Sequence, residues 1–167
     1  MMSLEDAYRS VSEMGLFSSF SETMLRLVAQ LAEPRQYSAG SQLFHEGAHC
    51  DELFVLLKGK VQLQMRVPGR GSIPILTLGP GQLVAWSSVL GNGEMTTSAT
   101  ALEETSAFVL PASKLKELFE QDHEFGYRFM EQLASALARR LVATRLQLLD
   151  LCSLDAPQIP AMEEQHG

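Results

Sequence analysis

The stretch from Tyr37 to Met65 constrains the fold most, because glycines at positions 40, 47 and 59 divide it into short apolar segments. Along residues 61–67 the odd-numbered residues are apolar and the even-numbered ones polar, as in an antiparallel strand with one face on a core. Glycine accepts a positive φ at little cost, so Lys58-Gly59-Lys60 predicts a hairpin turn. Short strands joined by tight turns must close or stack to protect their edges. The pattern therefore predicts a small antiparallel barrel or jelly roll.

Length and charge limit the classes of protein that the chain can belong to. With 167 residues, 46% of them apolar, it can bury roughly 70% of its unfolded surface in one domain. The net charge of −7 argues against nucleic-acid binding, which needs a basic patch. No apolar run approaches the roughly 18 residues of a membrane span, and two cysteines do not suggest a disulfide framework. We therefore expect a cytoplasmic protein that binds neither nucleic acid nor membrane.

Helices are predicted before the roll. Residues 3–35 carry helical periodicity with one break, and Ser19–Glu22 fits a capping box. Pro34 is expected to end this helical segment, because proline disfavours a helical residue before it. Residues 36–110 then carry the strand patterns, among which Pro74 indicates an edge strand.

A helical half follows the roll. Residues 112–152 predict a short helix and then a long one, for which Asp122 is the expected cap. The tail, residues 153–167, is acidic, contains prolines and predicts disorder. The expected domain is thus residues 1–152. It is mainly β with α, an antiparallel jelly roll flanked by N-terminal helices and a long C-terminal helix.

The long helix carries two sets of apolar positions. Seven residues advance by steps of three and four, as in about three heptads: Met130, Leu133, Leu137, Leu141, Thr144, Leu148 and Leu151. A second set is placed to pack back onto the roll: Phe129, Ala136, Val142, Leu146 and Leu149. Two apolar faces favour a homodimer through the seven-residue seam over a single amphipathic helix lying on its own core.

The glycine-punctuated stretch also resembles the first half of a cyclic-nucleotide-binding domain. The likeness is carried by Gly40-x-x-Leu43-Phe44-x-Glu46-Gly47 and then by Asp51-Glu52-Leu53-Phe54-Val55-Leu56-Leu57-x-Gly59-x-Val61, and it continues to about Leu151. It implies a regulatory sensor of a small, nucleotide-like effector, with no other cofactor. Activators of this kind continue into a helix-turn-helix, whereas this sequence ends at Gly167. The resemblance therefore implies a stand-alone sensor whose output passes through a protein partner.

Residues 81–97 match the phosphate cassette of that family. There a Glu accepts a hydrogen bond from the ribose, and an Arg pairs with the cyclic phosphate. By the resemblance, the Glu position is Trp86 and the Gly before it is Ala85, while the Arg position falls at Met95, Thr96 or Thr97. No Lys or Arg occurs between positions 71 and 113. The cassette is therefore degenerate, and a cyclic phosphate held there loses charge-assisted bonds worth about 1.5–3 kcal/mol each.

The candidate ligand-binding residues come from the cassette and from the long helix. They are Val84, Ala85, Trp86, Ser87, Ser88, Thr96, Thr97 and Thr144. The serine and threonine hydroxyls, together with backbone N–H groups of the short cassette helix, are the available donors. The Trp86 indole is either a stacking platform for a flat ligand or a ring that fills the pocket. A pocket closed by its own side chains would leave a ligand-free dimerisation or partner-binding module.

Thr144 belongs to a motif, Ala138-Arg139-Arg140-Leu141-x-x-Thr144, that resembles the helix of the catabolite activator. The resemblance implies that this threonine contacts the base of the effector. Its position in the apolar seam fits a role in ligand binding or in helix register. The alternative is a hydroxyl bonded to the carbonyl one turn back.

His45, His49 and Cys50 form the one compact group of potential metal ligands. On an extended strand and turn their side chains do not converge, and a second ligand pair is missing, so we expect no metal site. A metal-dependent enzyme that uses this group is the weakest of the three functional hypotheses. No Ser/His/Asp arrangement and no evident carboxylate pair indicates catalysis, so we expect no enzyme.

Overall fold

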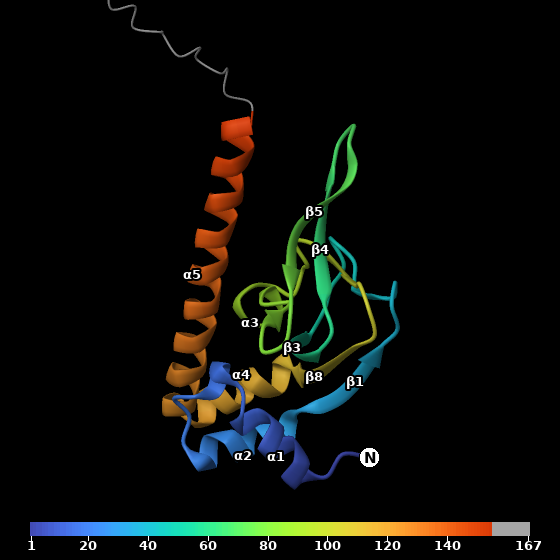
Figure 1. Cartoon of the computed structure of the whole chain (residues 1–167). Helices are drawn as coiled ribbons and strands as arrows, with labels where there is room; N and C mark the ends of the chain where they lie inside the picture. Colours follow the sequence, from blue (N-terminus) through green and yellow to red (C-terminus); the bar gives the residue numbers. More distant parts are fainter. Residues whose placement is uncertain (155–167) are drawn as a thin grey trace, which may run out of the picture.

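A computed structural model, which describes residues 1–154, places an antiparallel roll between helices from both ends of the chain (Figure 1). The helices are α1 (Leu4–Ser12), η1 (Gly15–Phe17), α2 (Glu22–Leu31), α3 (Ser87–Leu90), α4 (Ala112–Gln121) and α5 (His123–Leu154). The strands are β1 (Glu33–Tyr37), β2 (Gln42–Phe44), β3 (Glu52–Lys58), β4 (Val61–Val67), β5 (Gly71–Leu78), β6 (Leu83–Val84), β7 (Ser98–Ala101) and β8 (Thr105–Pro111). The predicted fold class is confirmed.

The helix boundaries follow from side-chain caps, and two predictions about them are corrected. The Ser21 hydroxyl accepts a hydrogen bond from the Met24 N–H at 3.3 Å, so the cap of α2 is Ser21 and not the predicted Ser19. The helical segment does end before Pro34, at Leu31, but residues 33–35, which the sequence assigned to it, begin β1, an edge strand where the missing N–H donor of Pro34 is tolerated. The Asp122 carboxylate accepts from the Phe125 N–H at 3.0 Å, which confirms the cap of α5.

The C-terminal helix is longer than predicted. It runs to Leu154, so residues 153 and 154, which the sequence assigned to the tail, are helical. The rest of the predicted tail, residues 155–167, lies outside the described part of the chain. Across residues 1–154, no helix combines the length and the apolar character that a membrane crossing requires.

The strands form two sheets of four, with the orders β1-β8-β3-β6 and β2-β7-β4-β5. β3 and β4 therefore belong to different sheets, and the hairpin predicted at Lys58-Gly59-Lys60 is wrong. The turn does need its glycine, because Gly59 has a φ of +90° and lies against the backbone of Thr105. Pro74 lies on β5 at the edge of the second sheet, as predicted.

The β4–β5 hairpin projects beyond the roll (Figure 1). Val61 and Leu63, at its base, have side chains in the core, as the alternation predicted. Met65, two residues further on, is 38% exposed because the hairpin has by then left the core. The apolar face of residues 61–67 is thus only half covered.

The apolar residues form two separate cores. The first joins the N-terminal segment, α4 and the start of α5 to the β1-β8-β3-β6 sheet, and it includes Phe17, Phe20, Phe108, Phe125 and Phe129. The second fills the space between the sheets with Phe44, Phe54, Leu56, Val61, Leu63, Leu78, Val84, Ala85, Met95, Ala99, Ala107 and Val109. The roll and the helical layer are therefore packed independently.

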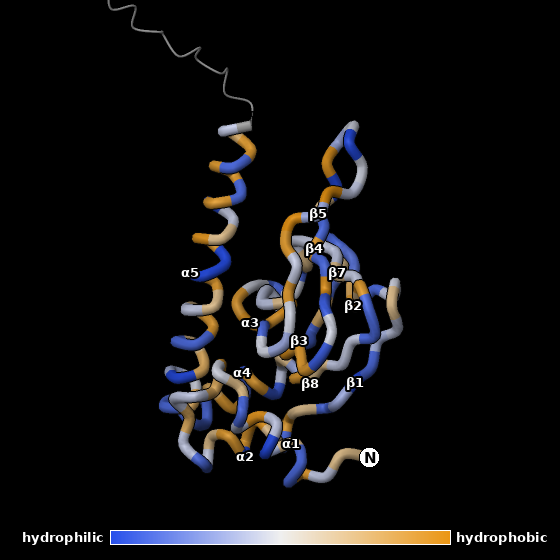
Figure 2. The backbone as a smooth tube through the Cα atoms, in the orientation of Figure 1, coloured by the Kyte–Doolittle hydropathy of each residue, from blue (hydrophilic) through white to orange (hydrophobic). Residues whose placement is uncertain are grey.

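α5 packs only through its first half. Phe125, Phe129 and Leu133 are at most 2% exposed, whereas the second half extends past the roll (Figure 1). Six large apolar side chains there are 52–65% exposed: Leu141, Val142, Leu146, Leu148, Leu149 and Leu151. Figure 2 shows the apolar positions along this free part of the helix. Val142, Leu146 and Leu149 do not pack back onto the roll, so that prediction is wrong.

Replacing Gly59 with alanine tests the turn between the sheets. An added Cβ would lie 2.6 Å from the Glu104 carbonyl oxygen and 2.8 Å from the Thr105 Cα, at a φ that disfavours side chains. We expect Gly59→Ala to lower the free energy of unfolding by about 2–4 kcal/mol, measured by urea denaturation. Gly40→Ala is the matched control, because Gly40 has a φ of +83° but open space around it. Equal losses from both variants would contradict the close contact at Gly59.

Candidate functional site

The cassette lies where the roll meets the helical layer. β6 pairs antiparallel with β3, and its two residues point to opposite sides of that sheet. The Leu83 side chain joins the helical core, and the Val84 side chain joins the roll core. Any ligand inside the roll is therefore on the Val84 side, whereas a ligand next to α5 is on the Leu83 side.

The turn from β6 into α3 has an unusual backbone. Ala85 has a φ of +69°, and it is the one non-glycine residue within residues 1–154 with a positive φ. The left-handed conformation costs about 1–2 kcal/mol for a residue with a Cβ, so glycine is the usual choice there. This is the position that the sequence aligns with the glycine of the family cassette. The backbone of the cassette thus keeps the conformation that the family glycine allows.

Several of the donors expected from the cassette helix are engaged within its own turn. The Ser88 hydroxyl donates to the Ala85 carbonyl at 2.7 Å, and the Ser88 N–H donates to the same oxygen at 3.1 Å. The Val89 N–H donates to the Trp86 carbonyl at 3.1 Å. Ser87 and Ser88 are both buried. These groups satisfy local backbone carbonyls instead of forming an anion site.

The Trp86 ring packs against the helical core and is half-buried there. It does not fill the interior of the roll, which contains the twelve apolar side chains of the second core. The hypothesis that the indole closes the roll pocket is therefore wrong. The family position for the ribose acceptor now carries a side chain that faces the other layer.

The three threonines of the predicted site lie apart. Thr96 is exposed beside a shallow surface hollow that Glu46 and Glu94 also line, where acidic side chains repel an anion. Thr97 is half-buried. The Thr144 hydroxyl donates to the Arg140 carbonyl at 2.8 Å, which is the one-turn-back bond that the sequence left as an alternative. The structure does not gather the eight predicted ligand residues around one cavity.

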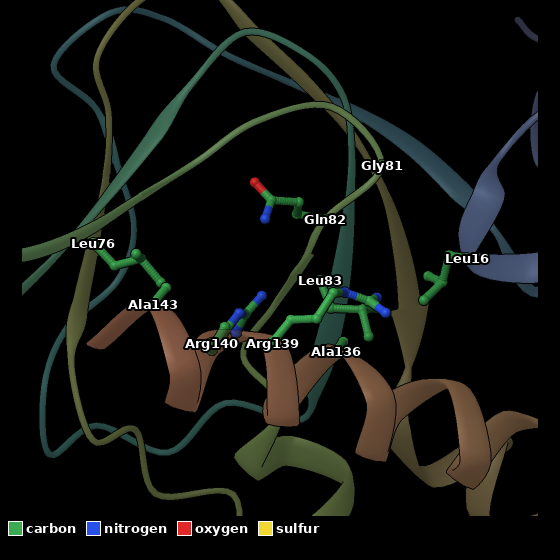
Figure 3. A pocket seen from close by; sticks show the side chains of 9 residues that line it. All are labelled: Leu16, Leu76, Gly81, Gln82, Leu83, Ala136, Arg139, Arg140 and Ala143. Carbon is green, nitrogen blue, oxygen red and sulfur yellow. The ribbon is translucent and has the colours of Figure 1, made fainter. Parts of the chain in front are cut away.

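A cavity of about 300 Å³ lies between α5 and the turn that joins β5 to β6 (Figure 3). Its walls come from η1, from β5, from residues 81–83 and from the middle of α5. The lining residues are Leu16, Leu76, Gly81, Gln82, Leu83, Ala136, Arg139, Arg140 and Ala143. None of the eight predicted ligand residues is among them.

Two arginines line this cavity, and the Arg140 side chain is less exposed to water than that of Arg139. The Arg140 side chain is half-buried, and this burial lowers its pKa to about 10, so the guanidinium remains charged at neutral pH. Among residues 1–154, no carboxylate lies within 4.0 Å of the guanidinium of Arg139 or Arg140. Sequence reasoning looked for cations in the cassette and missed them here. Helical spacing could have indicated this group, because residues three or four apart lie on the same face of a helix. Ala136, Arg140 and Ala143 are spaced in this way and line the same cavity.

The residues of the predicted dimer seam become more exposed along α5. Leu133 is 1% exposed within the core of its own chain, so in this arrangement it is not available to a second copy. Met130, Leu137 and Thr144 are half-buried, and Leu141, Leu148 and Leu151 are exposed. The part of the seam that a partner can reach therefore begins near residue 137.

The His45, His49 and Cys50 group does not form a metal centre in the described part of the chain, where no three His, Cys, Asp or Glu side chains converge. His45 and His49 are exposed. The Cys50 thiol donates to the Glu52 carbonyl at 3.6 Å, and burial raises its pKa. A raised pKa keeps this cysteine in the unreactive thiol form.

Comparison with known proteins relates the chain to one family. Residues 34–122 match the cyclic nucleotide-binding domain. The chain is 28% identical, over 86% of its length, to a CRP-like cAMP-activated global transcriptional regulator of Mycobacterium tuberculosis, and it covers 62% of that protein. It is 30% identical to the crystal structure of the catabolite activator protein of Thermus thermophilus, with a TM-score of 0.67, covering 83% of this chain and 62% of that one.

A third comparison concerns the fold alone. The crystal structure of a cyclic nucleotide-binding domain from Methylobacillus flagellatus has a TM-score of 0.76 to this chain at 23% identity, covering 88% of this chain and 83% of that one. The chain spans about 62% of the length of the two regulators named above. A family match that extends over more than half of the chain, with the same roll and long helix, settles the classification. The chain belongs to the cyclic nucleotide-binding domain family.

Proposed function

We propose that the chain is a small-molecule effector sensor with a degenerate phosphate cassette, and that it signals to a protein partner through a homodimer of α5. The observation that carries this proposal is the division of α5. Its first half is packed on the domain, and its second half leaves six large apolar side chains 52–65% exposed. Three of the six, Leu141, Leu148 and Leu151, belong to the predicted seam and form an exposed apolar stripe on one side of the helix, which is typical of a protein–protein contact.

α5 connects the domain to this exposed stripe without a break. Arg139, Arg140 and Ala143 line the cavity beside the roll, and Leu141 and Leu148 of the same helix are exposed. A continuous helix moves as a rigid element, so a change in its packing on the roll shifts the stripe as well. This supports α5 as the output element of the sensor.

The cassette supports an effector other than an ordinary, tightly bound cyclic nucleotide. It has no Lys or Arg, the Ser88 hydroxyl and the Ser88 and Val89 N–H groups bond to their own turn, and Trp86 faces the helical layer. The contacts that favour a charged phosphate are therefore missing from the roll side.

A ligand-free dimerisation module is the second candidate, and the filled interior of the roll favours it. The twelve side chains of the second core pack between the two sheets, and nine of them are at most 2% exposed. Under this alternative α5 has the same role in dimerisation, but no small molecule stabilises the protein. A thermal-shift screen separates the candidates, because a ligand that binds only the native state raises the unfolding temperature.

We expect cyclic AMP to bind with a dissociation constant no better than tens of micromolar. Two charge-assisted contacts of the family cassette are absent, and each is worth about 1.5–3 kcal/mol. Calorimetric titration of the unmodified protein measures this affinity. Submicromolar binding would show that hydroxyl and backbone donors suffice, and would contradict our interpretation of the cassette.

An introduced arginine tests the same point as a gain of affinity. Thr97 directly precedes β7 and is half-buried, so an arginine at 97 is partly shielded from water. We expect Thr97→Arg to tighten cyclic AMP binding about tenfold or more. Thr96→Arg is the matched control, because Thr96 is exposed near Glu94. Equal gains from the two variants would contradict this placement.

The homodimer is tested by charges on the exposed seam. Leu141 and Leu148 are 52% and 57% exposed, so lysines there leave the packing of a single chain intact. We expect Leu141→Lys with Leu148→Lys to convert a dimer into a monomer, because a dimer would bury both charges. Sedimentation velocity measures the change, and circular dichroism checks the fold. Leu146→Lys, an equally exposed leucine on the opposite side of α5 from Leu148, should remain dimeric, and a monomeric wild-type protein would contradict the proposal.

A further inference from the structure

We propose that the side of α5 away from the dimer seam binds an acidic amphipathic helix of a partner protein. Val142, Leu146 and Leu149 form this surface, the outer face, and their side chains are 54–65% exposed. The inference rests on the proposed output through a protein partner. It adds the surface that the partner contacts and the chemistry that the partner must have.

The outer face is separate from the seam. At 3.6 residues per turn, its centre lies roughly 140° around the helix axis from the centre of Leu141, Leu148 and Leu151. A homodimer through the seam therefore leaves the outer face in solvent. No other element among residues 1–154 covers it, and the second half of α5 stands clear of the other helices in Figure 1.

The spacing of the outer face fits a second helix. Val142 is followed by Leu146 after four residues and by Leu149 after three more, so the three side chains form one row along α5. Such rows interdigitate with a similar row on a partner helix. An occupant with apolar residues at i, i+3 or i+4 and i+7 therefore complements the outer face.

The polar positions near the outer face are basic. Residues 132–154 contain three arginines and one acid, in a chain whose net charge is −7: Arg139, Arg140, Arg145 and Asp150. Arg145 follows Val142 by three residues and precedes Leu149 by four, so it borders the outer face. It is exposed, and no carboxylate among residues 1–154 lies within 4.0 Å of it. Acidic side chains beside the apolar row of a partner complement this charge.

Charge also separates this occupant from two others. A second copy of the outer face would bring basic surfaces together, which is unfavourable. An anionic membrane would attract Arg145 but repel the chain as a whole, whose net charge is −7. A partner helix with acidic flanks satisfies the apolar and the basic positions together.

The test uses two synthetic amphipathic peptides as probes. Both carry leucines at i, i+3, i+4 and i+7, one with glutamates beside the leucines and the other with lysines. Each peptide is labelled with a fluorophore and titrated with the full chain, and its anisotropy is measured. We expect saturable binding of the glutamate peptide, and binding of the lysine peptide that is weaker by about tenfold or more.

Variants assign the binding to the outer face. Arg145→Glu should weaken the glutamate peptide about tenfold and strengthen the lysine peptide. Arg9→Glu, the same charge change at an exposed position of α1, at the opposite end of the molecule, should alter neither (Figure 1). Leu146→Gln should weaken both peptides, because it removes an apolar contact. Leu102→Gln, at a leucine 46% exposed between β7 and β8, should not.

Several results would overturn the inference. They are no saturable binding of the glutamate peptide, equal affinity for the two peptides, and losses from Arg9→Glu or Leu102→Gln that equal those from Arg145→Glu or Leu146→Gln. Binding to phosphatidylserine vesicles without binding to the peptide would assign the outer face to a membrane. A tetramer in sedimentation that Leu146→Gln converts to a dimer would assign it to a second copy.

The seam variant separates this inference from the proposed homodimer. Loss of the peptide in Leu141→Lys with Leu148→Lys, but not in Leu146→Gln, would place the peptide on the seam and overturn the assignment. A monomeric wild-type protein that binds the glutamate peptide would contradict the homodimer alone. A dimer that does not bind it would contradict the acidic partner alone.

Discussion

The aromatic contact at the start of α5 is the interaction on which the rest of the structure depends. Phe125 and Phe129 pack against Phe17 and Phe20 from the N-terminal segment and against Phe119 of α4, with ring centroids 5.3–6.4 Å apart. This cluster joins both ends of the chain into one layer on the β1-β8-β3-β6 sheet. Because it fixes α5 only at its beginning, the remainder of the helix extends past the roll and its apolar residues stay in solvent.

The positive charge beside the β5–β6 turn is on the helix and not on residues 81–97. No cation lies between positions 71 and 113, yet Arg139 and Arg140 reach the cavity from a segment far away in sequence. These two arginines belong to the helix that carries the exposed stripe, whereas the cassette belongs to the roll. Positive charge in this region is therefore supplied by the helical layer.

Much of the fold was predictable because its signals are local. Glycine spacing and alternation predicted the roll, Pro74 predicted an edge strand, and Asp122 predicted a helix cap. The errors concern partners that are distant in sequence. A glycine turn at Gly59 indicates the backbone angle but not which sheet receives the next strand, and heptad spacing did not show that Leu133 is buried by its own chain.

The candidate site was harder to predict, for two physical reasons. Short polar side chains such as those of Ser88 and Thr144 can bond to a nearby carbonyl as readily as to a ligand, and in this chain both do so. The second reason is the direction of the Trp86 side chain, which depends on Ala85. At a φ of +69° this residue turns the chain so that Val84 stays in the roll while Trp86 enters the helical core. With alanine at position 85 the turn keeps its left-handed backbone, and the Trp86 side chain packs against the helical layer.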